Sequence, residues 1–143
     1  MLLVVGNHNE VGDHPYSGHA LACATALATI EAYEEDNIFE NAKKVGKYLG
    51  ARLEELKAKH PSIGDARYIG MFSALELVKN RETKEPMDLT LLKNFMIENG
   101  VYVFNFKNIL FIVPPLVITE EQLEEGLILL DEGLEELMDK MVN

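Results

Sequence analysis

The sequence lacks the features that define several protein classes. Its 143 residues include one cysteine, Cys23, and no tryptophan. A single cysteine excludes an internal disulfide and makes a reducing cytoplasm the simplest location. No apolar run is long enough to span a bilayer, and the short run at residues 1–5 lacks the basic residue and cleavage site of a secretory signal. We therefore expect a cytoplasmic protein.

Basic residues are also scarce, since 13 Lys and Arg face 24 Asp and Glu, for a net charge of -11. Nucleic acids and anionic membranes both attract basic surfaces, so this balance argues against either partner. Zinc sites normally show closely spaced ligand pairs. The spacing of His8, His14 and His19 does not place two imidazoles on one helical face, so we expect no metal site.

What the sequence does contain is a regular alternation of helical and strand patterns in a length that fits one domain. The patterns predict helices near 18–35, 38–59, 89–98 and 120–141, strands within 63–69 and 71–78, and a hairpin of 101–104 with 109–113. Asn37 with Glu40, and Thr119 with Gln122, resemble capping boxes. Helices with a small, mainly antiparallel sheet imply a two-layer α/β sandwich.

The first predicted helix carries no charged residue between Gly18 and Ile30, and alanines recur along it. Such a helix should be buried on several sides, with Cys23 as a small buried hydrophobe. Ser17 is a natural N-cap, and the positive end of a helix suits an anion such as a phosphate. On these residues alone, an ordinary buried helix with a serine cap is the favoured interpretation.

Three segments together resemble a known family. They are YSGHALACATALATIE, GDARYIGMFSALELVKNRETKEP and ILFIVPPLVITEEQLEEGLILLDEGLEEL. In this order and spacing they resemble the C-terminal part of class III pyridoxal-phosphate-dependent aminotransferases, from His14 to about Met141. The resemblance implies the C-terminal domain of a fold type I transferase at residues 14–143. Residues 1–13 would then be a strand and loop remnant of the preceding domain.

The resemblance also implies site residues. Those matching Tyr16, Ser17 and Gly18 approach the phosphate of pyridoxal 5'-phosphate, often reaching the neighbouring subunit of a homodimer. Arg67 matches an arginine that precedes a glycine-rich turn, and for it a carboxylate-binding and a structural role are both open. No catalytic residue is assigned.

Three departures from the family pattern bear on activity. Pro15 stands where a threonine usually bonds the phosphate, and proline offers neither hydroxyl nor amide. Phe111 stands where many members that handle α-carboxylates have arginine, which favours amines or ω-amino acids as substrates. The usual Arg-Gly pair reads Arg67-Tyr68, so we expect an altered turn there.

The lysine that binds the cofactor lies upstream of the matching region in this family, and the first lysine here is Lys43, on a predicted surface helix. Since transamination needs that lysine, we expect this polypeptide alone neither to transaminate nor to bind the cofactor covalently. The expected partner is a second copy or an upstream half that binds the cofactor.

Two alternatives to that function remain. One is a non-catalytic interaction or dimerisation module descended from the family. The other is a small acidic partner-binding protein built on the Glu-rich last helix, which requires the three motifs to be coincidental. In either case, without a large domain the helix at 18–30 should expose apolar surface and promote self-association.

Overall fold

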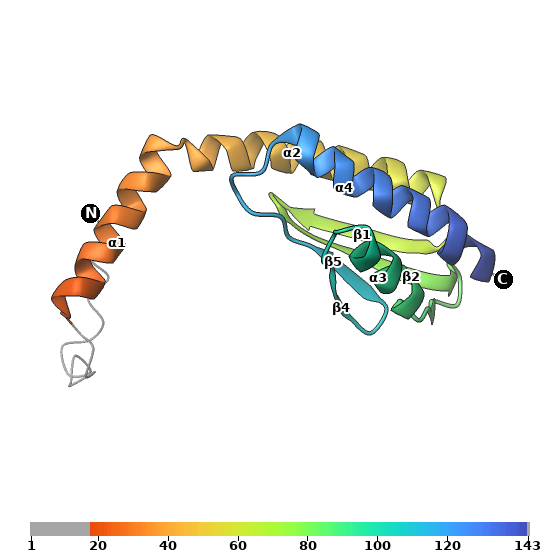
Figure 1. The fold of residues 1–143 in the computed structure, drawn as a ribbon. Coiled ribbons are helices and arrows are strands. Elements are labelled where there is room, and N and C mark those ends of the chain that lie inside the picture. Colours follow the sequence, from red (N-terminus) through yellow and green to blue (C-terminus); the bar gives the residue numbers. More distant parts are fainter. Residues whose placement is uncertain (1–17, 143) are drawn as a thin grey trace. The chain divides into compact units, whose positions relative to one another are not determined.

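The computed structural model describes residues 18–142, which divide between Asp36 and Asn37 into two units that we describe separately (Figure 1). The described part of the first unit is helix α1 (Ala20–Glu35). The second unit contains α2 (Ile38–Lys59), β1 (Ile63–Ile69), β2 (Phe72–Asn80), β3 (Glu85–Pro86), α3 (Thr90–Glu98), β4 (Phe104–Phe106), β5 (Ile109–Ile112) and α4 (Glu120–Gly133). A π-helical turn (Leu134–Met138) and a 3-10 turn (Asp139–Met141) continue α4. The predicted order of elements is confirmed, with β3 added.

The sheet runs in the order β1-β2-β5-β4, and β3 pairs with β2 near its end. Each of these pairings is antiparallel. Helices α2 and α4 lie side by side over one face of the sheet, as Figure 1 shows. This arrangement is the predicted two-layer α/β sandwich, and the other face of the sheet has no helix of this unit over it.

The core lies between the helices and the sheet. Alternate residues of β2, such as Leu75 and Leu77, point toward the helices because successive strand side chains face opposite ways. The predicted leucine stripes meet them and are buried: Leu49, Leu53 and Leu56 in α2, and Leu123, Leu127 and Leu130 in α4.

One of the two predicted capping boxes forms. Thr119 Oγ1 accepts from the Gln122 amide at 3.2 Å, and Gln122 Oε1 accepts from the Thr119 amide at 3.1 Å. The box predicted for Asn37 and Glu40 is wrong. Asn37 is the N-cap of α2, but its backbone is left-handed, with φ 50°, and its side chain makes no capping bond. Glu40 instead accepts a bond from Lys43 at 2.6 Å.

The turns also differ from the sequence prediction. The first strand of the hairpin, β4, begins only at Phe104 and ends at Phe106. Because Phe106 pairs with Ile109, the turn is formed by Lys107 and Asn108 alone. An altered turn was expected at Arg67-Tyr68, but these two residues belong to β1. The turn lies instead at Gly70 and Met71. Gly70 has a positive φ of 56°, a conformation that glycine adopts without strain.

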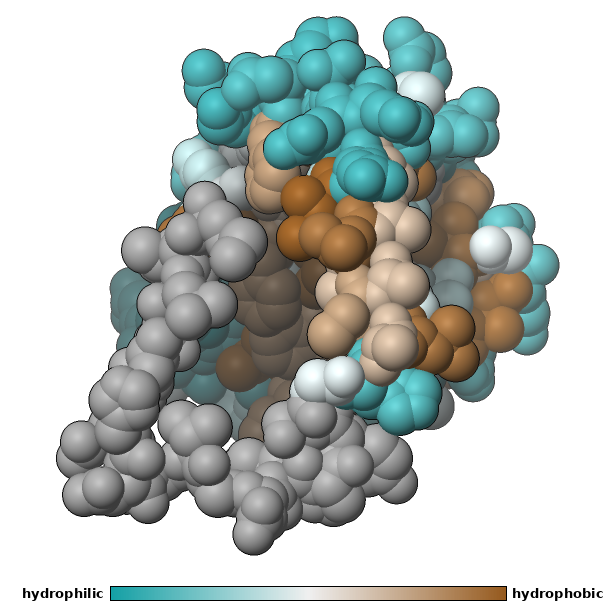
Figure 2. Space-filling model, turned by 90° about the vertical axis from the view of Figure 1, so that its left-hand side faces the viewer, coloured by the Kyte–Doolittle hydropathy of each residue, from teal (hydrophilic) through white to brown (hydrophobic). Residues whose placement is uncertain are grey.

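Helix α1 has no buried residue and is exposed along most of its length, so the expectation that its residues are buried is wrong for this structure. None of its residues is buried, and Leu21, Leu27 and Ile30 are 70%, 62% and 57% exposed. Cys23 is exposed as well. No other described helix or strand of the first unit packs against α1. Its apolar side chains therefore form an exposed surface, which Figure 2 shows. Within residues 18–142, no helix is both long and apolar enough to cross a membrane.

The close approach of α2 to the β1–β2 turn predicts opposite effects for two glycine substitutions. A Cβ on Gly46 would lie 2.8 Å from the carbonyl carbon of Gly70, whereas a Cβ on Gly126, inside α4, meets no atom within 4 Å. Gly46→Ala should lower the free energy of unfolding by about 1–3 kcal/mol through overpacking. Gly126→Ala should raise it by about 0.5–1 kcal/mol through helix propensity. Urea denaturation measures both, and equal effects of the same sign would contradict the packing described for Gly46.

The exposed face of α1 predicts self-association. Analytical ultracentrifugation of the 143-residue chain should show dimers or larger species at high concentration, because contact between copies removes α1 from water. Leu27→Glu should shift the distribution toward monomer. Ile128→Glu is the matched control, since Ile128 is an exposed apolar residue of α4 in the other unit. A clean monomer at high concentration would rule this out.

Candidate functional site

The start of α1 has an open backbone and no side-chain cap. The helix begins at Ala20 with His19 as N-cap, and the His19 side chain makes no capping bond. The N-cap predicted at Ser17 lies outside the described residues, as does Tyr16. Gly18 has a φ of +74° and open space where a Cβ would be. Among the described residues, the first-turn amides thus lack a side-chain acceptor, as an anion site requires.

Arg67 lies on β1 with its side chain 56% exposed. Its Nη2 lies 3.4 Å from Glu76 Oε2 on β2, and its Nε lies 3.6 Å from Asp65 Oδ2. Exposed ion pairs at such distances contribute little to stability. The Glu76 contact crosses two paired strands, which suits a structural role, while the exposed guanidinium also leaves room for a carboxylate ligand. Both roles stay open.

Asp65, one of the two carboxylates beside Arg67, also pairs with a second cation, Lys57. Lys57 Nζ lies 3.0 Å from Asp65 Oδ1, and this hydrogen bond is the main cause of a lowered pKa for Asp65. The lower pKa gives a stabilisation that is present at neutral pH and is lost as the pH falls through the folded-state pKa. The charges around Arg67 are therefore already largely paired.

The open face of the sheet carries a row of side chains that starts at Arg67. Backbone pairing places Arg67 opposite Ala74, Ala74 opposite Phe111, and Phe111 opposite Phe104. Only the methyl group of Ala74 lies between the guanidinium and the aromatic residues along this row. Arg67 and Phe111, which the sequence identified separately, thus lie on one face, two strands apart.

Aromatic residues enclose a shallow hollow at the far end of that row. The rings of Phe72 and Phe104 lie 6.0 Å and 5.6 Å from the ring of Phe111, measured between centroids. Together with Tyr102 and Val113, these three residues line a space of about 400 Å³. Phe72 and Phe104 are each more than half exposed. The hollow suits the apolar part of a ligand, and sequence analysis found only Phe111 because the others depend on strand register.

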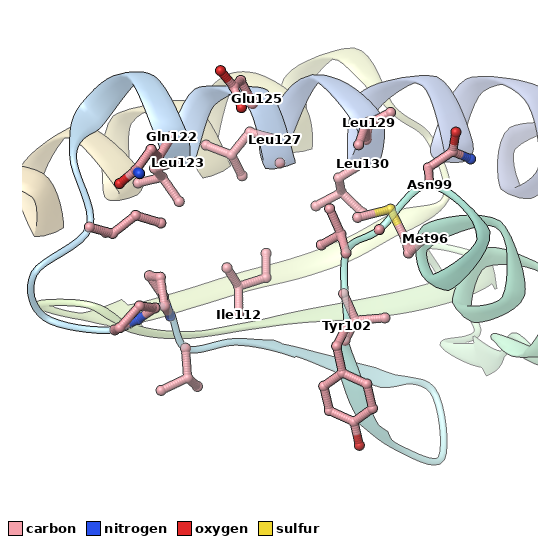
Figure 3. Close-up of a pocket in the computed structure, with 18 of the residues that line it drawn as sticks. Met96, Asn99, Tyr102, Ile112, Gln122, Leu123, Glu125, Leu127, Leu129 and Leu130 are labelled. Carbon is pink, nitrogen blue, oxygen red and sulfur yellow. The ribbon is translucent and has the colours of Figure 1, made fainter.

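A second hollow of about 500 Å³ lies between α4, the end of α3 and the segments on either side of the hairpin. Figure 3 shows Ile112, Leu123 and Leu127 directed into it, while Glu125 points away. The polar Gln122 at one end is already bonded to Thr119. With no charged group directed into it, this hollow offers apolar contact and no acid–base chemistry.

Several lysines in the part of the chain that the structure describes are paired with carboxylates. A nucleophilic lysine must be able to lose its proton, but the hydrogen bonds that Lys59 donates to Asp131 and Glu135 raise its pKa. Lys57 and Lys79 are likewise paired with carboxylates. Over residues 18–142, no three metal-ligating side chains of the His, Cys, Asp and Glu types gather in one place.

Comparison with known proteins agrees with the fold and the motifs. The model of the aminotransferase class-III family matches residues 4–134. The adenosylmethionine-8-amino-7-oxononanoate aminotransferase of Methanocaldococcus jannaschii is 36% identical over 115 residues, which cover 77% of this chain and 25% of that protein. The putrescine–pyruvate aminotransferase of Pseudomonas aeruginosa is 40% identical over 115 residues, with the same coverage of 77% and 25%.

A solved structure gives the same result in three dimensions. The crystal structure of the Methanocaldococcus jannaschii aminotransferase superposes with a TM-score of 0.77 and 33% identity. The match covers 92% of this chain and 32% of that one. The chain therefore spans about 25% to 32% of the length of these relatives. The three-motif resemblance and the two-layer fold are confirmed together, and the chain belongs to the class III aminotransferase family, whose members depend on pyridoxal 5'-phosphate.

Proposed function

We propose that this chain supplies the C-terminal part of a cytoplasmic class III aminotransferase, which moves an amino group from an amine or ω-amino acid to a 2-oxo acid. The observation that carries the proposal is the family match over residues 4–134, combined with relatives that are three to four times longer. In this proposal residues 14–143 form the small domain and residues 1–13 belong to the preceding domain. The partner is an upstream half that binds the cofactor, or a further copy of the chain in a homo-oligomer.

Pyridoxal 5'-phosphate supplies the electron-withdrawing ring on which amino groups are exchanged. The described residues fit its phosphate end only. Gly18 has an open backbone, and the first turn of α1 has amides without a side-chain cap. We propose Tyr16, Ser17 and Gly18 as one wall of the phosphate site, to which Pro15 can donate no hydrogen bond. The lysine that binds the cofactor would come from the upstream half, so this chain holds no cofactor covalently.

The aromatic side chains on the open face of the sheet favour an amine as the substrate. Phe111 and its aromatic neighbours form an apolar wall where related enzymes that take α-carboxylates have arginine. A carboxylate placed there would lose its hydration without gaining a charged partner. The similarity to an aminotransferase of putrescine, a substrate without a carboxylate, favours the same class. Arg67 would line the substrate side or brace β1 against β2 through Glu76.

A second candidate function is a non-catalytic dimerisation module descended from the family. The exposed apolar length of α1 favours it, because that surface can be covered by another copy as well as by a large domain. Pro15 and Phe111 favour it too, since both replace residues with polar roles in the family. For both candidate functions, the net charge of -11 argues against a nucleic acid or a membrane as the partner.

Reconstitution separates these two functions. Mixed with an upstream half that binds the cofactor, the chain should restore the visible absorbance of lysine-bound pyridoxal phosphate and amine-dependent conversion of pyruvate to alanine. The control is the same upstream half with its cofactor lysine changed to alanine, which should give neither signal. A stable complex that remains colourless and inactive would contradict the aminotransferase proposal and support the dimerisation module.

In the reconstituted enzyme, Phe111→Arg should change substrate preference. A guanidinium on the apolar wall would pair with an α-carboxylate, so kcat/KM should rise for α-amino acids and fall for apolar amines, by about tenfold or more. Phe106→Arg is the matched control, because Phe106 lies on the same face but outside the aromatic hollow. If the two variants shift substrate preference equally, Phe111 has no special place in substrate selection.

A further inference from the structure

The aromatic hollow is the space on the open face of the sheet that is lined by Phe72, Tyr102, Phe104, Phe111 and Val113. Phe72 comes from β2 and Phe104 from β4, the two strands that flank β5 in the sheet. Their rings are tilted by 52° and 30° to the ring of Phe111, with centroids 6.0 Å and 5.6 Å from it. Aromatic rings attract one another in tilted arrangements at centroid distances of about 4.5–7 Å. The hollow is therefore a cluster of rings that a further ring can join.

The size of the aromatic hollow suits a small molecule. Its volume of about 400 Å³ falls within the range of about 300–1,000 Å³ that is usual for small-molecule sites. A stable protein–protein interface takes about 20–30 residues from each partner, whereas five side chains line this space. Tyr102 is 76% exposed, and Figure 3 shows its side chain directed away from α4. The hollow thus opens on the face that carries Phe111, where substrate selection is proposed.

The lining of the hollow disfavours a charged group. None of the five side chains carries a charge, and the Tyr102 hydroxyl is the one polar side-chain group among them. An ammonium group has three N–H donors, so one hydroxyl would leave most of them unpaired. Removing an unpaired charge from water is costly, and contact with an aromatic ring recovers only part of that cost. The second ammonium of a diamine is therefore a poor occupant.

Among uncharged groups, an aromatic ring gains more from this lining than an aliphatic chain does. Both kinds of group remove apolar surface from water. A ring also makes edge-to-face or offset-stacked contacts with Phe72, Phe104 and Phe111, and such contacts stabilise beyond the burial of area. The lining therefore favours an aryl group over an alkyl chain of similar length.

We propose that the aromatic hollow holds the aryl group of the amine substrate, so that the enzyme prefers arylalkyl amines. This inference rests on the proposed aminotransferase function and narrows its substrate from amines in general to one class. The aryl group lies against Phe72, Tyr102 and Phe104, and the amino group stays outside the apolar lining. Tyr102, Phe104 and Val113 are then specificity-determining residues in addition to Phe111.

Initial rates of the reconstituted enzyme, with pyruvate as the acceptor, test this preference. The value of kcat/KM for phenethylamine should exceed that for hexylamine by about twofold to tenfold, because the rings of the hollow attract an aryl group more than an alkyl chain. It should exceed that for putrescine by about tenfold or more, because the second ammonium loses its water. Equal values for phenethylamine and hexylamine, or a higher value for putrescine, would overturn the proposal.

A pair of valine substitutions locates the preference in the hollow. Val113→Phe fills the hollow, so the ratio of kcat/KM for phenethylamine to that for propylamine should fall by about tenfold. Val117→Phe is the matched control, since Val117 is similarly exposed, at 61% against 56% for Val113, and lines neither hollow. A ratio that both substitutions lower equally, or that neither lowers, would contradict the proposal while leaving the aminotransferase function intact.

A second pair of substitutions covers the case in which Val113→Phe does not fold. Phe104→Leu removes one ring of the hollow, so the preference for phenethylamine over hexylamine should fall by about twofold or more. Phe106→Leu is the control, because Phe106 lies on the same face outside the hollow. Equal losses in these two variants would contradict a role for the hollow.

Ring signals of the 143-residue chain give a readout that does not depend on turnover. With its Phe and Tyr rings labelled for NMR, added phenethylamine should shift the signals of Phe72, Tyr102 and Phe104 more than that of Phe106, and Val113→Phe should remove the difference. Equal shifts inside and outside the hollow would overturn the proposal. If the reconstituted enzyme converts no amine, the aminotransferase proposal fails, and these ring signals decide whether the hollow binds an aryl group.

Discussion

The alternation of side chains along β2 is the constraint on which the rest of the structure depends. This strand pairs with β1 on one side and β5 on the other, so its register sets that of the main sheet. Leu75 and Leu77 point into the core, and Ala74 and Glu76 point to the open face. A shift of one residue would exchange these two sets. The same alternation therefore fixes both the core and the face on which substrate selection is proposed.

Periodicity explains why much of the fold could be predicted from sequence. Leucines at helical spacing predicted α2 and α4, and β-branched and aromatic runs predicted the strands. The capping box at Thr119 was predictable because both of its partners lie within one turn of helix. The box at Asn37 failed because a left-handed backbone there removes the capping geometry, which residue types alone do not reveal.

The candidate site was harder to predict, because its parts come together through long-range pairing. Arg67 and Phe111 were identified from motifs, but their common row depends on the register of β1, β2 and β5. The contacts of His60 with Asp131 and Asp139 could not be predicted either, since these two carboxylates lie more than 70 residues away from it in sequence. The burial expected for α1 came from its composition. The apolar composition of α1 indicates that its surface is suited to burial, but it does not identify the segment or the partner that would bury it.

We propose that α1 and the open face of the sheet both contact a cofactor-binding half. Amide chemical shifts of the labelled chain, recorded while that half is added, test this most directly. Chemical shifts should change at Gly18, in the first turn of α1 and along the row from Arg67 to Phe104, and should stay unchanged on the solvent face of α2. Changes confined to the solvent face of α2, or no changes at all, would contradict it.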